Sequence, residues 1–418
     1  MSRNVSQVGE SSKTRSTSVP KRDDDSHRQK ILVLGWRKSG KTSCIKTVFQ
    51  NVPAREVPYF GVTQKIEKIN YDSIVPLQIW DTPSNFELDQ LEVPISTFST
   101  VVYVLDMQQD DSYHESILRF VHLMVKIYLL NPSIRFHMFI HKSEVLSEDY
   151  RGENYAEIQR TTSEEIEDFP YKSLLNSNST SNQHQQQHAN NTIGDKWDLE
   201  DQQTVGMIIN TLISEIRYSM TSVHDVTLRD AWSRVLQGGM EMLPAVESLL
   251  LDFTSHSSAD NSFLFDINSG VILATDNRHR TDDLSEQVTE YLSSFLAFRD
   301  LYKNIKKQKP TSNGSSDPKT EKEHGNPNGI GNEADPEEES EEDNDEPGGW
   351  WDDEDPDAPW MTQSTRLMPN TTLALWQFTP YLALVVLLRT ETWHARRGTI
   401  EYNLTFLRQG VREILSVV

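Results

Sequence analysis

Eight consecutive residues near the start of the chain, Gly35–Thr42 (GWRKSGKT), fit the pattern G-x-x-x-x-G-K-[ST] in full. An apolar run over 30–34 reads as a strand and 42–49 reads as a helix, which is the context that this motif needs. The glycines let backbone N–H groups turn onto phosphate oxygens, and the helix N-terminus adds the positive end of a dipole. The alternative is a chance glycine turn before a helix. The motif predicts a nucleotide-phosphate site made by Gly35, Lys38, Ser39, Gly40, Lys41, Thr42 and Ser43.

Further side chains are placed to hold a metal ion and to complete this site. Lys41 would reach the β- and γ-phosphates as a catalytic charge, and the Thr42 hydroxyl would hold Mg²⁺. Asp81 follows a short apolar strand, where phosphate-loop hydrolases keep an aspartate for Mg²⁺; a carboxylate that caps the loop is the alternative. Thr63 lies between them, in the segment Asn51–Gln64. A threonine there can close on the metal and the γ-phosphate and act as a switch.

Two more strand ends carry residues that could read the base. His141-Lys142-Ser143-Glu144 is related to the guanine-reading sequence N/H-K-x-D, whose carboxylate accepts two N–H bonds from guanine. Thr221 and Ser222 end the next strand, where small polar residues contact the guanine carbonyl through backbone N–H groups. Loops that follow parallel strands meet at one edge of the sheet, so we expect His141, Lys142, Glu144, Thr221 and Ser222 beside the phosphate loop.

Composition and charge bound the class of protein. The chain has 418 residues and a net charge of −23, but the tract 331–357 holds 15 acidic and no basic residues, so the rest carries only −8. This balance gives no basic groove for nucleic acid. The single cysteine, Cys44, fits a reducing compartment. The sequence shows no apolar run of membrane-spanning length, signal peptide or lipidation motif, so we expect any membrane residence to be indirect.

The first part of the chain alternates strands and helices, as a parallel α/β domain does. Residues 1–28 are polar and predict a disordered tail, and the domain follows over 29–237. The segment 173–191 is rich in Ser, Asn, Gln and His and predicts a disordered insertion; a metal pair at its histidines is the alternative. The predicted strands are 31–34, 77–80, 100–105, 135–140 and 216–220, and the clearest helix is 115–128.

A second domain is predicted over 238–418, in the order helix, two strands, helix, three strands, helix. This order suits an α/β layer in which helices cover a mostly antiparallel sheet. Residues 307–360 are rich in Pro, Gly and Asn and then strongly acidic, which predicts a disordered loop; a docking site for a basic partner is the alternative. The elements are expected at 241–253, 262–266, 271–275, 284–305, 364–368, 371–378, 381–390 and 400–415.

These motifs resemble the Rag GTPases, and within them the RagC/RagD type. The resemblance covers roughly 29–305 and 364–418, and its features are Gly35–Thr42, the run 77–81, the run 139–142 and the run 220–222. In the second domain, Phe263–Asp266, the run 274–276 and the run 400–403 also resemble this family. The histidine at 141 is fairly specific to the RagC/RagD branch.

The resemblance implies a fold, cofactors and partners. The fold would be a Ras-like P-loop GTPase domain with a mostly parallel sheet, followed by a roadblock-type α/β dimerisation domain. The cofactors would be GTP or GDP with Mg²⁺. The second domain would pair with a RagA/RagB-type GTPase, and the pair would recruit the TOR kinase complex in amino-acid signalling. A scaffold complex would supply the anchor on the cytoplasmic face of the vacuole or lysosome membrane.

Three residues depart from the family pattern. Where the family has D-x-P-G-Q, this chain has Asp81-Thr82-Pro83-Ser84-Asn85. Loss of the glycine restricts the backbone, and Asn85 is one methylene shorter than the catalytic glutamine. Glu144 replaces an aspartate and could misplace its carboxylate against guanine. We therefore expect slow hydrolysis.

Two other functions stay open on these residues. A pseudo-GTPase that holds nucleotide mainly for stability is favoured by Ser84, Asn85 and Glu144 and opposed by the intact phosphate and metal residues. A small-molecule kinase or ATPase is opposed by the guanine-type sequence over 141–144. The GTPase and the pseudo-GTPase differ in whether partner affinity changes with the bound nucleotide.

Overall fold

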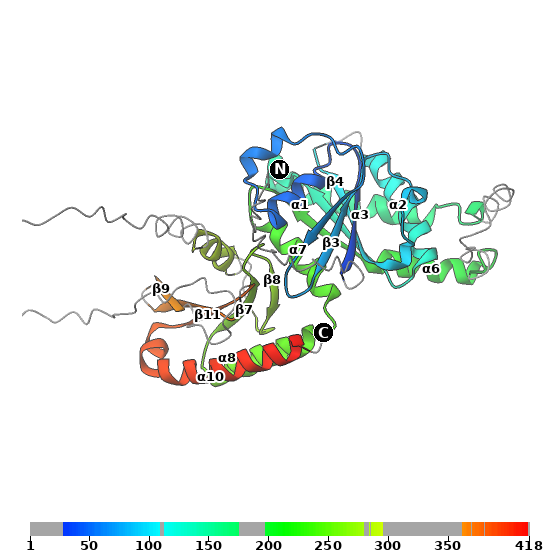
Figure 1. Ribbon diagram of the computed structural model, residues 1–418. Helices are drawn as coiled ribbons and strands as arrows, with labels where there is room; N and C mark the ends of the chain where they lie inside the picture. The colour runs from blue at the N-terminus through cyan, green and yellow to red at the C-terminus, as the bar shows by residue number, and fades with distance from the viewer. Residues whose placement is uncertain are drawn as a thin grey trace, which may run out of the picture.

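A computed structural model describes residues 28–108, 113–174, 197–279, 284, 286–295, 362–368, 370–379 and 381–416. Its elements form two sheets, each with its own helices (Figure 1). The tail predicted over 1–28 and the insertions predicted over 173–191 and 307–360 lie almost entirely outside the described residues. Within the described part, no helix is both long and apolar enough to span a membrane.

The first sheet has six strands in the order β2-β3-β1-β4-β5-β6. Every neighbouring pair is parallel except β2 and β3, so the prediction of a mostly parallel sheet is confirmed. Five of its strands were predicted, and the sixth, β2, is an antiparallel edge strand. The strands are β1 (Gln29–Gly35), β2 (Glu67–Tyr71), β3 (Leu77–Asp81), β4 (Phe98–Asp106), β5 (Arg135–His141) and β6 (Ile216–Thr221).

Helices cover both faces of this sheet because its central strands are apolar on both sides. Ile31 and Val33 pack into one core with α1 and α7, whereas Leu32 and Leu34 pack into a second core with α2, α3 and α6. The helices are α1 (Lys41–Phe49), α2 (Tyr113–Leu130), α3 (Glu148–Glu167), α6 (Gln202–Glu215) and α7 (Thr227–Gly239). Short 3₁₀ turns lie at η1 (Ala54–Tyr59), η2 (Leu88–Gln90), η3 (Ile95–Thr97) and η4 (Ser143–Val145).

The second sheet is antiparallel throughout, in the order β8-β7-β11-β10-β9. Helices α8 and α10 pack against one of its faces, and the helical residues 286–295 pack against the other (Figure 1). The second part of the chain is therefore an α/β layer, as predicted. Its elements are α8 (Leu243–His256), β7 (Asn261–Asp266), β8 (Ile272–Thr275), β9 (Thr362–Met368), β10 (Thr371–Gln377), β11 (Leu382–Arg389) and α10 (Thr390–Ser416).

The last helix differs from the prediction at its start. It was expected over 400–415, but α10 begins at Thr390, directly after β11, and bends at Arg396, where φ is −126° and ψ is 15°. Its first turn is anchored by Trp393, which is buried and packs against Trp376 of β10 with ring centroids 5.8 Å apart. The sequence prediction missed this turn because one isolated tryptophan among polar residues does not produce a helical apolar periodicity.

Helix α7 joins the two sheets. On the side of the first sheet, the Trp232 indole N–H donates to the carbonyl of Cys44, at 3.1 Å. On the other side, the Gln237 amide donates to the Ile272 carbonyl at 3.0 Å, and the Ile272 N–H donates to the Ser233 hydroxyl at 3.0 Å. One apolar core therefore runs from α1 through α7 to the second sheet.

Candidate nucleotide-binding site

The loop Gly35–Thr42 connects β1 to α1 and is shaped by two glycines with positive φ. The φ of Gly35 is 151° and that of Gly40 is 101°. A Cβ on Gly35 would lie 2.3 Å from the carbonyl oxygen of Val104, and a Cβ on Gly40 would lie 2.5 Å from Cδ2 of His141. Neither position has room for a larger residue. The backbone thus turns as a phosphate cradle requires, and it does so ahead of the N-terminus of α1.

Polar side chains of this loop lie inward. Lys41 is nearly buried, and its Nζ donates to the carbonyls of Gly35 at 2.9 Å and Trp36 at 3.1 Å. Burial lowers the pKa of Lys41 to about 8, although the charge of Asp81 acts in the opposite direction. The hydroxyl of Ser39 is buried and has no hydrogen-bond partner among the described residues. A buried donor without a partner is costly, and phosphate oxygens would satisfy it.

Three side chains from separate segments meet beside the start of α1. The Thr42 hydroxyl donates to Oδ2 of Asp81 at 2.5 Å, and the Thr63 hydroxyl donates to the same oxygen at 3.0 Å. The two hydroxyl oxygens are 2.8 Å apart. Asp81 ends β3 and is fully buried, and its Oδ1 has no hydrogen-bond partner among the described residues. Burial raises the pKa of Asp81, while the bonds from Thr42 and Thr63 lower it.

This group fits a divalent cation. Mg²⁺ prefers oxygen ligands and is held in nucleotide sites by one or two protein groups together with phosphates. Thr42, Thr63 and Asp81 offer such oxygens. Oδ1 of Asp81, which has no hydrogen-bond partner among the described residues, has lone pairs available to coordinate the cation. The described residues hold no group of three or more His, Cys, Asp or Glu side chains that could bind a metal by themselves. The histidine pair considered in the segment 173–191 lies outside the described residues.

The residues predicted to read the base surround His141, the last residue of β5. Its Nδ1 lies 3.0 Å from the Thr221 hydroxyl, and its ring covers Gly40 of the phosphate loop. Burial, and then the charge of Lys142, lower the pKa of His141 to about 4, so the ring is neutral. Lys142 adopts a left-handed backbone with φ 64°. Its Nζ donates to the carbonyl of Lys38, a cradle residue, at 2.9 Å.

The sequence argument missed the ion-pair partner of Lys142. Asp106 ends β4, and its Oδ2 accepts a hydrogen bond from Lys142 Nζ at 2.5 Å. Its Oδ1 accepts one from the backbone N–H of Gln108 at 3.0 Å. A carboxylate directly after a predicted strand was the available signal, by the same logic that singled out Asp81.

Three other predicted residues follow β5 and β6. Glu144, in η4, is exposed, and within the described residues its carboxylate has no hydrogen-bond partner. Thr221 and Ser222 are buried. The Ser222 N–H donates to the Thr227 hydroxyl at 3.0 Å, and this bond links the loop to the start of α7. The structure thus brings His141, Thr221 and Lys142 to the cradle, and leaves the Glu144 side chain exposed to solvent.

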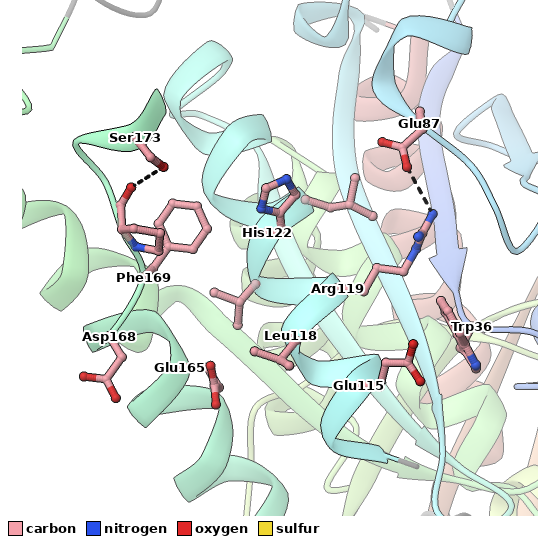
Figure 2. Close-up of a pocket in the computed structure, with 13 residues that line it drawn as sticks. Trp36, Glu87, Glu115, Leu118, Arg119, His122, Glu165, Asp168, Phe169 and Ser173 are labelled. Carbon is pink, nitrogen blue, oxygen red and sulfur yellow. Dashed lines mark hydrogen bonds and ion pairs between the residues drawn. The ribbon is translucent and has the colours of Figure 1, made fainter. Parts of the chain in front are cut away.

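The loop after Asp81 is held by an arginine that the sequence argument did not select. Arg119 of α2 donates to the carbonyl of Phe86 at 2.7 Å. It also pairs with Glu87 at 3.7 Å and lies 5.5 Å from the ring centroid of Trp36 (Figure 2). Trp36, Glu87 and Arg119 line a cavity of about 480 Å³ beside α2 and the end of α3. Asn85, the predicted catalytic residue, is exposed and has no hydrogen-bond partner among the described residues, and Ser84 is half-buried.

Comparisons with known proteins agree with these motifs. The human Ras-related GTP-binding protein C is 25% identical over 399 residues, which cover 94% of this chain and 78% of that protein. The Schizosaccharomyces pombe GTP-binding protein gtr2 is 23% identical over 393 residues, covering 93% and 98%. The S. pombe protein gtr1 is 21% identical over 281 residues, covering 63% and 76%.

A solved structure and a family model also match. The Myxococcus xanthus protein MglB aligns at 13% identity with a TM-score of 0.27, covering 43% of this chain and all of that one. This score is too low to carry an argument about the second domain, whose fold rests on its own strand order. The model of the Gtr1/RagA G protein conserved region matches residues 30–296, more than half of the chain. The phosphate loop, the Thr42–Asp81 pair and the base-side residues all lie within this match, and the chain belongs to the Gtr1/RagA family of GTP-binding proteins, with relatives of the RagC/Gtr2 type.

Proposed function

We propose that this chain is a nucleotide-gated regulatory GTPase that pairs with a Gtr1/RagA-type GTPase. The observation that carries the proposal is the meeting of Thr42, Thr63 and Asp81 on one buried carboxylate oxygen. Family membership establishes guanine-nucleotide binding in general, and this meeting point gives the binding a route to conformational change.

Thr63 is the movable member of the three. Thr42 belongs to α1 and Asp81 to β3, whereas Thr63 belongs to an irregular segment whose neighbour Val62 is 73% exposed. Among the described residues, the Thr63 hydroxyl forms side-chain hydrogen bonds with Thr42 and Asp81 only. A bound Mg²⁺–triphosphate would supply positive charge and phosphate oxygens at this point, so its presence would change what holds Thr63. A ligand that favours one position of this segment shifts the population of the surface that partners contact.

The second domain offers a surface for the partner. On α10, Tyr402 is 63% exposed and Phe406 is 58% exposed, and their rings contact each other edge to face at 5.0 Å. Leu251 of the neighbouring α8 is 41% exposed. Large apolar side chains that are exposed on two packed helices are typical of interaction surfaces. Because relatives include both gtr1-type and gtr2-type proteins, a heterodimer through this face is the arrangement that we propose.

The cellular role that we propose follows the family resemblance. The pair would report amino-acid availability to the TOR kinase complex on the cytoplasmic face of the vacuole or lysosome. A scaffold complex would hold it there, so the contact with the membrane would be indirect. Mg²⁺ would accompany GTP or GDP at Thr42 and Asp81.

Co-purification tests the pairing. The full chain is expressed with a Gtr1-type GTPase, as wild type and as Tyr402→Glu with Phe406→Glu. The control is Tyr150→Glu, because Tyr150 is equally exposed at 62% but lies on α3 of the first domain. We expect wild type and control to yield a one-to-one complex and the double variant to yield separate chains. Pairing that survives the double substitution would contradict the proposed surface.

The exposed position of Asn85 favours a second candidate, a subunit that holds nucleotide with little hydrolysis. The two candidates differ in their output. A switch binds its partner with different affinity in the GDP and GTP-analogue states, whereas a structural subunit binds it equally in both.

A further inference from the structure

Three arginines gather at the end of the first sheet that lies away from the nucleotide loops. Arg135 begins β5, Arg217 is the second residue of β6, and Arg234 belongs to α7. Parallel pairing places His137 of β5 beside Arg217. Alternate residues of a strand face the same side. Phe139 of β5 packs on Trp232 of α7, so Arg135 and His137 also face α7.

Contacts with α7 bring the arginines together. A Cβ on Gly238 would lie 3.5 Å from Cδ of Arg135 and 4.0 Å from Nη1 of Arg217. One helical turn earlier, Nη1 of Arg234 contacts the Ser219 hydroxyl of β6 at 3.4 Å. Residues four apart share a helix face. The face of α7 that carries Arg234 and Gly238 therefore lies over Arg135 and Arg217.

Among the described residues, these guanidinium groups lack the carboxylate partners that arginines usually have. Within the described part of the chain, no carboxylate forms an ion pair with Arg135, Arg217 or Arg234. Arg217 and Arg234 are exposed and Arg135 is half-buried. The chain as a whole carries a net charge of −23, so a group of like positive charges runs against its general balance. Such a group repels itself until an anion neutralises it.

A buried polar side chain lies next to the arginines. His137 is 0% exposed, and neither of its ring nitrogens has a hydrogen-bond partner among the described residues. Burial, and then the charges of Arg217, Arg135 and Arg234, lower the pKa of His137 to about 3, so the ring is neutral. Buried polar groups without partners are rare in folded proteins and call for an explanation. Within the described part of the chain, a neutral ring whose nitrogens lack partners thus lies beside guanidinium groups that lack carboxylate partners, and this combination suits an oxygen-rich anion.

We propose that Arg135, Arg217 and Arg234 form a second anion site that binds a phosphate monoester. Arginine presents N–H donors in a planar fork that matches phosphate oxygens, which makes it the preferred residue for this group. The site is distinct from the phosphate loop, because β5 begins at Arg135 and ends at His141, whose ring lies against Gly40 of that loop. A phosphoinositide headgroup and a small soluble phosphate ester share this chemistry. The inference goes beyond the proposed function and does not depend on it.

The test uses the full chain saturated with GDP and Mg²⁺, so that the phosphate loop is occupied. One arm titrates inositol 1,4,5-trisphosphate by calorimetry. The other measures sedimentation with phosphatidylcholine vesicles, with and without phosphatidylinositol 4-phosphate. We expect binding in at least one arm, and a rise in Kd of about tenfold or more for Arg135→Gln with Arg217→Gln, since charge-assisted hydrogen bonds are lost. The control, Arg389→Gln, removes an exposed arginine of the second domain and should bind as wild type does.

A further variant keeps the test valid if the arginine substitutions unfold the protein. Gly238→Asp places a carboxylate beside Arg135 and Arg217, where a Cβ has ordinary van der Waals room. It should abolish anion binding without lowering the melting temperature. Binding to the soluble ester identifies a free anion as the ligand, and binding to vesicles alone identifies the lipid headgroup. Absence of binding in both arms, or binding that both variants retain, would overturn the proposal.

Discussion

The hydroxyl of Tyr71, at the end of β2, donates a hydrogen bond to Oδ2 of Asp266 at the end of β7. Asp266 is fully buried and also accepts from the hydroxyls of Ser73 at 2.7 Å and Ser269 at 2.6 Å and from the N–H of Ser269 at 2.9 Å. Burial and the charge of Asp266 raise the pKa of Tyr71 well above its usual range, so the phenol stays protonated as the donor. The hairpin β2–β3, which ends at Asp81, is thus fastened to the second domain.

Removal of the hydrogen bond between Tyr71 and Asp266 should weaken the interface between the two domains. We expect Tyr71→Phe to lower the free energy of unfolding by about 1–2 kcal/mol, because Asp266 then loses one buried donor. Urea denaturation measures this cost. Tyr381→Phe, at an exposed tyrosine, is the matched control and should change little. A double-mutant cycle with Asp266→Asn should show coupling between the two residues, and strict additivity would contradict a direct bond.

Gly40 should tolerate no side chain. Its φ of 101° disfavours any L-residue, and an added Cβ would lie 2.5 Å from His141. We expect Gly40→Ala to weaken GDP binding by about tenfold or more, since the loop must leave its cradle conformation. Gly61→Ala is the control, because nothing lies within 4 Å of its added Cβ. Equal GDP affinity of the two variants in a fluorescent-nucleotide titration would show that the cradle shape is not required.

His137 should make the protein sensitive to acid. Its ordinary pKa of 6.5 is lowered to about 3 in the folded state by burial and the nearby arginines. Below about pH 6.5, His137 of the unfolded chain therefore binds a proton that His137 of the folded chain does not bind. The free energy of unfolding consequently decreases as the pH is lowered to about 3. Each unit below 6.5 costs about 1.4 kcal/mol, so we expect a loss of about 2 kcal/mol between pH 7 and about pH 5 from this residue.

The variant His137→Phe isolates this contribution. Unfolding free energies of wild type and variant are compared across the pH range, so that contributions from His141 and from carboxylates cancel. The difference should grow as the pH falls. Parallel profiles would mean that His137 is not buried and neutral in the folded protein.

The sequence was sufficient for elements with strong apolar patterns. The central strands β1, β3, β4 and β5 have nearly continuous buried runs and were placed within two residues of their ends. The edge strand β2 escaped because only Tyr71 of its five residues is buried, so it shows no apolar alternation. Its position follows from pairing with β3, which is a tertiary fact.

The site shows the same division. The phosphate loop and Asp81 could be found because the fixed spacing of a motif and the end of an apolar strand are both visible in the sequence. Arg119 could not, since it lies in mid-helix and gains its role only where α2 meets Phe86 and Trp36. The departures from the family pattern drew attention to Asn85 and Glu144, but they could not locate either side chain. The exposure of both residues depends on how their loops fold.

Hydrolysis should be slow and should respond to the loop after Asp81. We expect Ser84→Gly with Asn85→Gln to raise the single-turnover GTPase rate of the purified heterodimer by about tenfold, because a longer amide on a freer backbone can orient the attacking water. Asp89→Asn, at an exposed residue a few positions further along, serves as the control. A rate that does not rise in the double variant would argue against the assignment of positions 84 and 85.

The proposed function depends most directly on the binding of a guanine nucleotide with Mg²⁺ at Asp81. The decisive measurement is the dissociation rate of fluorescent GDP from the full chain, with Mg²⁺ and with chelator, for wild type and Asp81→Asn. We predict that chelation speeds release from wild type by about tenfold or more, and that Asp81→Asn releases GDP at one fast rate in both conditions. Failure of the wild-type chain to bind GDP, or an equal Mg²⁺ effect in Asp81→Asn, would contradict it.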